Sequence, residues 1–398
     1  MQFFMRRFMF LISTMKARPD RIRRSAAIML FCALAFGCQV NTPGEGPNIA
    51  AAPDETKITL PDQESLGSGQ IRISLLLAHK GEHGLTKQAV EIRNGAALGL
   101  KDLGARALTL TIHTTSGGAD GLKQLARQEA ANGARLIVAV ADETAIAGLK
   151  AKAVPTIAVI PDHAPRDRKV FAFAFDETDS LLYGITHAAG QGAKKAVLFA
   201  PEGYRKERLN WLNEQLGTRL ALKAYLYRSD ESANAILQRA GDALAAADII
   251  AFAGADGQIV KIARAIRSRK QASAKAVFVG HSGWPASIWK NPSLAGAVLA
   301  RLDTGNLSRI TKRYETENGH PPGTEAGYGY DIIAMTAGIA RLHGRKGLNR
   351  KTLLSKTGFR GTTGVFRFAA NGDVERQAAI YAVRKRKLVL INPAAKSF

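Results

Sequence analysis

The chain has 398 residues, of which 46% are hydrophobic and 22% charged, so it is long enough to bury a sizeable core in more than one lobe. Its formal net charge is +23, and the part after residue 37 still carries 49 Lys and Arg against 32 Asp and Glu, which favours polyanionic neighbours without specifying one. The only cysteines are Cys32 and Cys38, which excludes a disulfide framework, a thiol nucleophile or a cysteine metal site in the rest of the chain.

Residues 1–37 have the pattern of an export signal. A basic stretch at 21–24 precedes an apolar run at 25–37, which is too short for a membrane span of about 20 apolar residues. The segment Ala35-Phe-Gly-Cys38 resembles the bacterial lipobox, which implies cleavage before Cys38 and lipid modification of this cysteine. An ordinary signal peptide with an incidental cysteine is the alternative.

The start of this signal is open, and a segment of different composition follows it. A second apolar patch at residues 8–12 leaves the start of translation open between Met1 and Met15. Residues 38–70 are rich in Pro, Gly, Asn, Asp and Glu and contain few large apolar residues, which predicts a flexible tether.

The body of the chain begins with a strand–loop–helix unit at residues 71–103. A buried strand is predicted at 71–77, a glycine-containing loop at 78–84, and then a helix with apolar residues at 3.6-residue spacing. Ligands of such folds meet the loops at the carboxyl ends of strands, so the loop at 78–84 is the first candidate for function.

The same alternation continues to the end of the chain. Further strands are predicted at 108–113, 135–140, 154–160, 171–175, 196–200, 220–227, 248–252, 276–279, 297–302, 364–368 and 377–383, the last two joined by an Asn371-Gly372 hairpin turn. Helices are predicted at 121–132, 144–150, 179–190, 204–216, 232–247, 258–268, 307–318 and 325–343. This pattern predicts an α/β fold with two doubly wound parallel-sheet lobes joined by crossing segments. The first lobe is expected at 71–175 and 303–348, and the second, with a C-terminal hairpin, at 176–302 and 349–398.

Two short motifs suggest catalysis, but their context favours loops. His79-Lys-Gly-Glu-His83 matches the H-x-x-E-H pattern of zinc peptidases, which needs both histidines on one helix face, whereas its glycine and the preceding strand predict a loop. Gly280-His-Ser-Gly283 lacks the G-x-S-x-G spacing of a serine nucleophile. We therefore expect no enzymatic activity, metal or cofactor, and a metallopeptidase stays a third hypothesis that depends on finding zinc.

The sequence gives little support for nucleotide or nucleic-acid binding. No phosphate-binding or dinucleotide-binding glycine motif is present. The basic stretches are not interleaved with aromatic residues, so nucleic-acid binding is not expected.

Three segments of the body stand out, namely IRNGAALGL at 92–100, AVLFAPEGY at 196–204 and GYGYDII at 327–333. They resemble, in this order, the NGAELAL segment, the strand and loop that open the second lobe, and the YDA helix of the type I periplasmic binding proteins of the leucine/isoleucine/valine-binding kind. The resemblance implies two lobes that face each other across a ligand-binding cleft.

The tail contains the segments GFRGTTGVFRF at 358–368 and NGDVER at 371–376. They are similar to a subgroup of this family, the penicillin-binding-protein activators, and GHSGW at 280–284 and the ending at 392–398 also fit that subgroup. By resemblance, the chain is therefore a lipoprotein that regulates a penicillin-binding protein or another cell-wall synthase.

The loops depart from the amino-acid receptors of the family. These receptors typically carry Ser-Gly-Pro in the first loop, where this chain has His79-Lys-Gly81. In place of the Gly-x-x-x-Ser element that holds the ligand carboxylate, the chain has Ala139-Val-Ala-Asp-Glu-Thr144, whose two acids would each repel a carboxylate by roughly 1 kcal/mol or more. Binding of an ordinary α-amino acid is therefore not favoured.

The candidate ligand-binding residues are the polar and aromatic side chains of loops that face the expected cleft. They are His79, Lys80, His83, Asp142, Glu143, Thr144, Asp162, His163, Glu202, Tyr204, Asp256, His281, Ser282, Trp284 and Tyr328.

Two function hypotheses follow. The first is a non-enzymatic regulator of cell-wall synthesis, exported and lipid-anchored through Cys38 to a bacterial membrane, facing the periplasm. The alternative is a substrate-binding receptor that delivers an amino acid or another small polar solute to an ABC permease. Both place a hinge between the two lobes.

Overall fold

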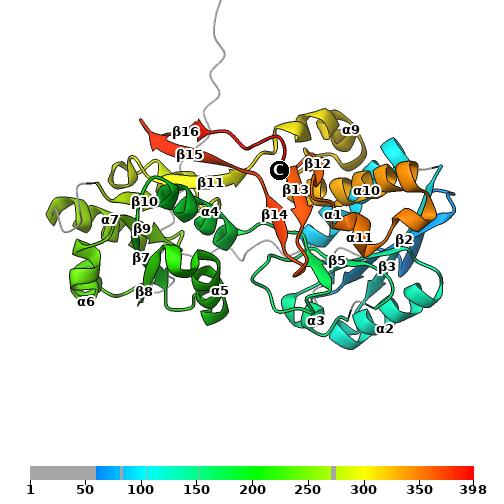
Figure 1. Ribbon diagram of the computed structural model, residues 1–398, viewed down its shortest axis with the longest axis horizontal. Helices are drawn as coiled ribbons and strands as arrows, with labels where there is room; N and C mark the ends of the chain where they lie inside the picture. The colour runs from blue at the N-terminus through cyan, green and yellow to red at the C-terminus, as the bar shows by residue number, and fades with distance from the viewer. Residues whose placement is uncertain (1–59, 81–83, 105, 151, 270–274) are drawn as a thin grey trace, which may run out of the picture. The chain divides into compact units, whose positions relative to one another are not determined.

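The computed structural model describes residues 60–80, 84–104, 106–150, 152–269 and 275–398, which lie within one contact unit, Thr56–Phe398. The predicted signal, Cys38 and most of the predicted tether lie outside the described residues. Figure 1 shows helices arranged around separate sheets.

The first lobe is built on a six-stranded sheet with the order β1-β3-β2-β4-β5-β6. Its strands are β1 (Gln63–Leu66), β2 (Ile71–Ala78), β3 (Leu108–Thr115), β4 (Leu136–Val140), β5 (Thr156–Ala158) and β6 (Val170–Ala172). All are parallel except β1, which pairs antiparallel with β3. The helices of this part are α1 (Lys87–Gly99) with a π-helical end (Leu100–Gly104), α2 (Gly118–Ala131), α3 (Glu143–Ala147), α9 (Ser308–Asn318), α10 (Thr324–His343) and α11 (Arg350–Leu353).

The second lobe is built on a seven-stranded sheet with the order β16-β15-β11-β10-β9-β7-β8. Its strands are β7 (Lys195–Pro201), β8 (Ala221–Tyr227), β9 (Ile249–Phe252), β10 (Val277–Val279), β11 (Val298–Leu302), β15 (Ala378–Arg384) and β16 (Lys387–Asn392), of which the last two are antiparallel additions. Its helices are α4 (Glu177–Gly190), α5 (Lys206–Leu216), α6 (Ala233–Ala245), α7 (Gly257–Arg269) and α8 (Ala286–Trp289), with 3₁₀ turns at Gly217–Arg219 and Pro292–Leu294. Two further 3₁₀ turns, Gly305–Leu307 and Arg345–Gly347, flank α9 and α10.

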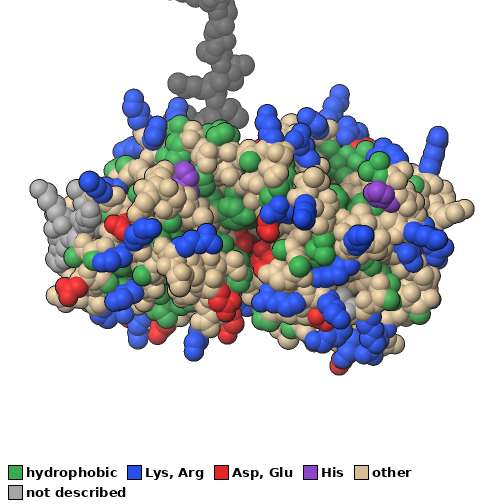
Figure 2. Space-filling model, in the orientation of Figure 1, with side chains coloured by type: hydrophobic (Ala, Val, Ile, Leu, Met, Phe, Trp, Pro, Cys, Tyr) green, Lys and Arg blue, Asp and Glu red, His purple; other side chains and the backbone are tan. Residues whose placement is uncertain are grey.

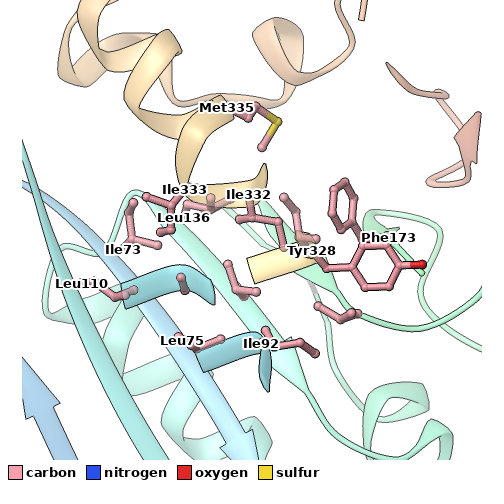
Figure 3. Close-up of a cluster of buried hydrophobic side chains, with 14 of the residues drawn as sticks. Ile73, Leu75, Ile92, Leu110, Leu136, Phe173, Tyr328, Ile332, Ile333 and Met335 are labelled. Atoms are coloured by element: carbon pink, nitrogen blue, oxygen red, sulfur yellow. The ribbon is translucent and has the colours of Figure 1, made fainter. Parts of the chain in front are cut away.

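Each sheet carries a hydrophobic core on both faces, as expected for strands that are apolar throughout. Figure 3 shows one of these cores, in which side chains of β2 to β4 meet those of α1 and α10. Helices α1 and α10 approach closely because each presents a glycine. A Cβ atom on Gly95 would lie 1.8 Å from the carbonyl oxygen of Ala326, and one on Gly329 would lie 2.0 Å from that of Ile92.

Three connections join the lobes. They are residues 173–176 after β6, 303–307 after β11, and Gln377 between β14 and β15. The chain therefore passes between the two sheets three times.

The structure corrects three details of the sequence interpretation. Residues 63–66, predicted to be tether, form β1, because this segment pairs with the open edge of β3. The Asn371-Gly372 turn joins β13 (Gly364–Phe368) to β14 (Val374–Arg376), not to the strand at 377–383, which belongs to the second sheet. With β12 (Phe359–Gly361) these strands form a small third sheet.

This third sheet packs with the first lobe, although residues from 349 onward were predicted to belong to the second. The apolar side chains of β13 lie against the first core, where the rings of Phe366 and Phe173 are 4.8 Å apart. The carboxylate of Asp331 in α10 accepts hydrogen bonds from the backbone and hydroxyl groups of both Thr362 and Thr363, at 2.5–2.9 Å. The lobe-2 part of the tail therefore begins only at β15.

Candidate functional site

A cavity of about 990 Å³ is lined by residues of both lobes and of the connections between them. In the first lobe the lining comes from the loops after β4 and β5 and from the start of α10. In the second lobe it comes from the segments after β7 and β10, from the end of β11 and from β15. The walls are thus mainly loops at the carboxyl ends of strands, where parallel α/β folds bind their ligands. We call this cavity the cleft.

An ion pair crosses the cleft. Glu143, in the first turn of α3, binds Arg205, which immediately precedes α5, with Nη1–Oε2 and Nη2–Oε1 distances of 2.5 and 2.7 Å. The helix start that presents Glu143 is fixed by Asp142, whose side chain accepts a hydrogen bond from the amide of Ala145 at 2.8 Å. The paired side chains are 25% and 43% exposed, so solvent reaches this contact.

A second charged contact lies at the connection after β6. Asp176 caps α4 through the amides of Thr178 and Asp179, and its other oxygen lies 2.7 Å from His163 Nε2 and 3.4 Å from Arg208 Nη2. Burial alone would raise the pKa of Asp176, but the contacts with His163 and Arg208 outweigh it and lower this pKa below its ordinary value. A charged, firmly held carboxylate therefore stands at the connection between the lobes.

Acidic groups outnumber basic groups in the cleft, although the chain as a whole is strongly basic. The acids are Asp142, Glu143, Asp176, Glu177 and Glu325, and the bases are Arg205, Arg208 and Arg301. Arg205 and Arg208 are engaged by Glu143 and Asp176. Figure 2 shows acidic side chains gathered near the middle of this face, while Lys and Arg are spread over the rest of it.

Aromatic groups complete the lining. Tyr328 of α10 is buried, and its hydroxyl accepts a hydrogen bond of 3.1 Å from the amide of Phe175. Burial raises the pKa of Tyr328 to about 12, so the hydroxyl stays neutral. Phe175 and Tyr381 also border the cleft, which gives it apolar surface beside its charges.

The cleft contains some of the residues that the sequence predicts. Asp142, Glu143, Thr144, Ser282 and Tyr328 line it. The other described candidates do not, namely His79, Lys80, Asp162, His163, Glu202, Tyr204, Asp256, His281 and Trp284. His83 lies outside the described residues.

Two of these candidates have a packing role instead. His281 and Trp284 are buried, and the ring nitrogens His281 Nε2 and Trp284 Nε1 lie 3.2 and 2.9 Å from the carbonyl oxygen of Gly254. Burial lowers the pKa of His281. This pair fixes the loop after β10 to the loop after β9 and leaves only the neighbouring Ser282 and Gly283 to the cleft.

Asp162 lines a separate cavity of about 350 Å³ beside the connection after β6. Its Oδ1 accepts a hydrogen bond of 2.9 Å from the amide of Val374. Burial and the nearby charge of Asp373 raise the pKa of Asp162 to about 7. Arg166 forms an ion pair with the carboxylate of Asp373 and donates a hydrogen bond to the backbone carbonyl of Asp162. These contacts hold the third sheet against the loop after β5.

Several lining residues were not predicted, among them Gln88, Arg205, Arg208, Arg301, Glu177 and Glu325. Glu177, Arg205 and Glu325 stand at or just before the first residues of α4, α5 and α10, so their helix-start positions were the available signal. Arg301 lies inside β11, and nothing in the sequence distinguishes it from an ordinary outward-facing residue of a strand.

The described residues contain no group of three His, Cys, Asp or Glu side chains placed to hold a metal ion. Glu82 and His83 of the H-x-x-E-H match are not among those residues. No helix in the described segments has the length and apolarity needed to cross a membrane.

Comparison with known proteins identifies the fold. No family model matches the chain, and no curated protein matches it. Among solved structures it is similar to a protein of Rhodospirillum rubrum assigned to branched-chain amino acid ABC transport, with 17% identity, coverage of 81% of this chain and 99% of that one, and a TM-score of 0.62.

Two further structures agree with this. An ABC transporter substrate-binding protein of Sphaerobacter thermophilus shares 17% identity over 82% of this chain and 97% of its own, with a TM-score of 0.55. A leucine-binding protein of Thermotoga maritima shares 18% identity over 81% and 99%, with a TM-score of 0.50. The chain therefore has the α/β fold of type I periplasmic binding proteins, with two mostly parallel sheets.

Proposed function

We propose that the protein is a non-enzymatic binding protein that holds a small polar solute in the cleft. The observation that carries the proposal is a cavity of about 990 Å³ lined by strand-end loops of both lobes, in a fold whose solved examples include ABC transporter substrate-binding proteins. The lining combines three aromatic side chains with eight charged ones, so it offers a solute both apolar and ionic contacts. In this role an ABC permease is the partner.

The charges of the cleft favour a solute with a cationic group. Glu177 and Glu325 have no ion pair among the described residues, whereas two of the three cleft arginines are already paired. A cation near one such carboxylate gains about 1–4 kcal/mol, depending on how much water it displaces. Arg301, the third cleft arginine, has no ion pair among the described residues and can bind one anionic group of the same solute.

A regulator of a cell-wall synthase is the second candidate. By the resemblance of the loop at 139–144, Asp142 and Glu143 stand where the amino-acid receptors of that family hold a ligand carboxylate. In the structure Glu143 is bound to Arg205. The tail at 358–376 resembles the penicillin-binding-protein activators. In this role the partner is a protein, and a lipid anchor at Cys38 would keep both at one membrane.

Thermal unfolding with a panel of solutes tests the first proposal. A ligand that binds the folded state raises the unfolding temperature, and at 100 times its Kd it stabilises by about 2.7 kcal/mol. We expect diamines and basic amino acids to stabilise the protein more than dicarboxylates or sugars. The double variant Glu177→Gln/Glu325→Gln should lose the effect, and Glu214→Gln on the exposed face of α5 should keep it.

If no solute in the panel stabilises the protein, solute binding is refuted. Capture of a cell-wall synthase from solubilised membranes by the full chain, unchanged by the cleft variants, would then favour the regulator. Capture of an ABC permease would favour the receptor.

A further inference from the structure

The tip of the β15–β16 hairpin combines backbone strain with charge. Arg384 pairs with Lys387, so the two strands are joined by the two-residue turn Lys385-Arg386. Both turn residues have positive φ angles, 49° and 59°. Such a turn, with both central residues left-handed, is normally built from Asn-Gly or Gly-Gly, because other side chains adopt this conformation at a free-energy cost.

These are the only non-glycine residues with positive φ in the part of the chain that the structure describes. The connection between β13 and β14 is longer, residues 369–373, and its one positive φ angle, 86°, falls on a glycine, Gly372. A strained conformation that persists where a relaxed alternative is available points to a role for the side chains themselves.

The side chains at this tip are four consecutive cations. Residues 384–387 are all exposed, and none of them forms an ion pair within the described segments. Figure 1 places the hairpin at the periphery of the second lobe, and Figure 2 shows Lys and Arg side chains projecting there. The tip therefore presents a concentrated positive charge that the protein itself does not neutralise.

The adjoining strand adds apolar surface. In β16, Val389 and Leu390 are 37% and 49% exposed, and this strand is the outer edge of the seven-stranded sheet. A bilayer interface offers anionic headgroups beside apolar acyl chains, so it suits cations and neighbouring apolar side chains together. An acidic polymer would suit only the cations.

We propose that the β15–β16 hairpin is a membrane-contacting arm that binds anionic lipid headgroups through residues 384–387. The proposal does not depend on a ligand in the cleft or on lipidation of Cys38. The arm lies on the second lobe, so contact with a membrane would orient that lobe and leave the remaining surface free.

Vesicle co-sedimentation tests the proposal, with the full chain carrying Cys38→Ser so that no acyl chain contributes. The double substitution Lys385→Asn/Arg386→Gly installs the preferred turn sequence and removes two charges. Since each cation near an anionic surface contributes about fivefold to binding, we expect affinity for vesicles containing phosphatidylglycerol to fall about 25-fold. The unfolding temperature should stay equal or rise, because the turn is relaxed.

The matched control is Lys261→Asn/Arg264→Gln, which removes two exposed cations from α7. It should change vesicle binding less than twofold, and binding of the parent protein should weaken steeply with salt. The proposal is overturned if the turn variant binds like the parent, if the α7 control loses as much, or if uncharged phosphatidylcholine vesicles bind equally well. Tight binding to polyglutamate without binding to anionic vesicles would assign the tip to an acidic polymer instead.

Discussion

The ion pair between Glu143 and Arg205 offers the most direct test of how the cleft works. It joins α3 of the first lobe to the start of α5 in the second, with both carboxylate oxygens and both terminal guanidinium nitrogens engaged. Exposed ion pairs contribute up to about 1 kcal/mol, and this two-pronged geometry places the pair near that limit. This pair is formed in a closed molecule and is broken in an open one, in which the lobes have moved apart. Glu143→Gln should therefore reduce the ratio of closed to open molecules about fivefold.

The chain is well suited to measuring this change, because no cysteine follows Cys38. With Cys32 and Cys38 replaced by serine, spin labels at Gln124→Cys on α2 and Gln238→Cys on α6 report the distance between the lobes. We expect longer distances in Glu143→Gln and in Arg205→Gln.

A double-mutant cycle separates the contact from other effects of either substitution. The two changes together should open the cleft no further than one alone, which gives a coupling energy of about 0.5–1 kcal/mol. Glu214→Gln, an exposed substitution on α5, serves as the control. Unchanged distance distributions, or fully additive effects, would show that this ion pair does not bias the closed state.

Three further predictions concern stability. Asp331→Ala should destabilise the fold by about 3–5 kcal/mol in urea unfolding, because it leaves the buried donors of Thr362 and Thr363 without an acceptor. Asp331→Asn, which keeps one acceptor oxygen, should destabilise the fold less. Burial raises the pKa of Asp162 to about 7, above its value in the unfolded chain. The contribution of this carboxyl to the free energy of unfolding is therefore complete at acidic pH and is lost as the pH rises from about 4 through 7. Asp162→Asn should thus flatten the decrease in stability over this range by up to about 4 kcal/mol, and an unchanged slope would exclude this carboxyl as its cause. Gly95→Ala should destabilise by about 3 kcal/mol or more in thermal unfolding, whereas Gly338→Ala, which meets open space, should be neutral or stabilising.

The sequence predicts the layered fold well because its signal is periodic. Strands such as β2 and β4 are apolar throughout, and the helices between them repeat their apolar residues at helical spacing, so both lobes can be recognised before any contact is known. The predictions fail where pairing is decided by distant partners. β1 has no apolar periodicity and becomes a strand because β3 offers it an open edge.

The cleft is predicted only in part, for a related reason. Strand-end position suggests Glu143, which lines the cleft, but it suggests His281 equally. Only packing shows that His281 contacts the carbonyl of Gly254 inside the second lobe. Arg205 is important because it lies opposite Glu143, and two residues 62 positions apart carry no sequence signal of that proximity. Local patterns therefore determine which loops reach the cleft. The charge that a solute meets there depends on pairing between the lobes, because each arginine bound to a carboxylate is one fewer available to an anion.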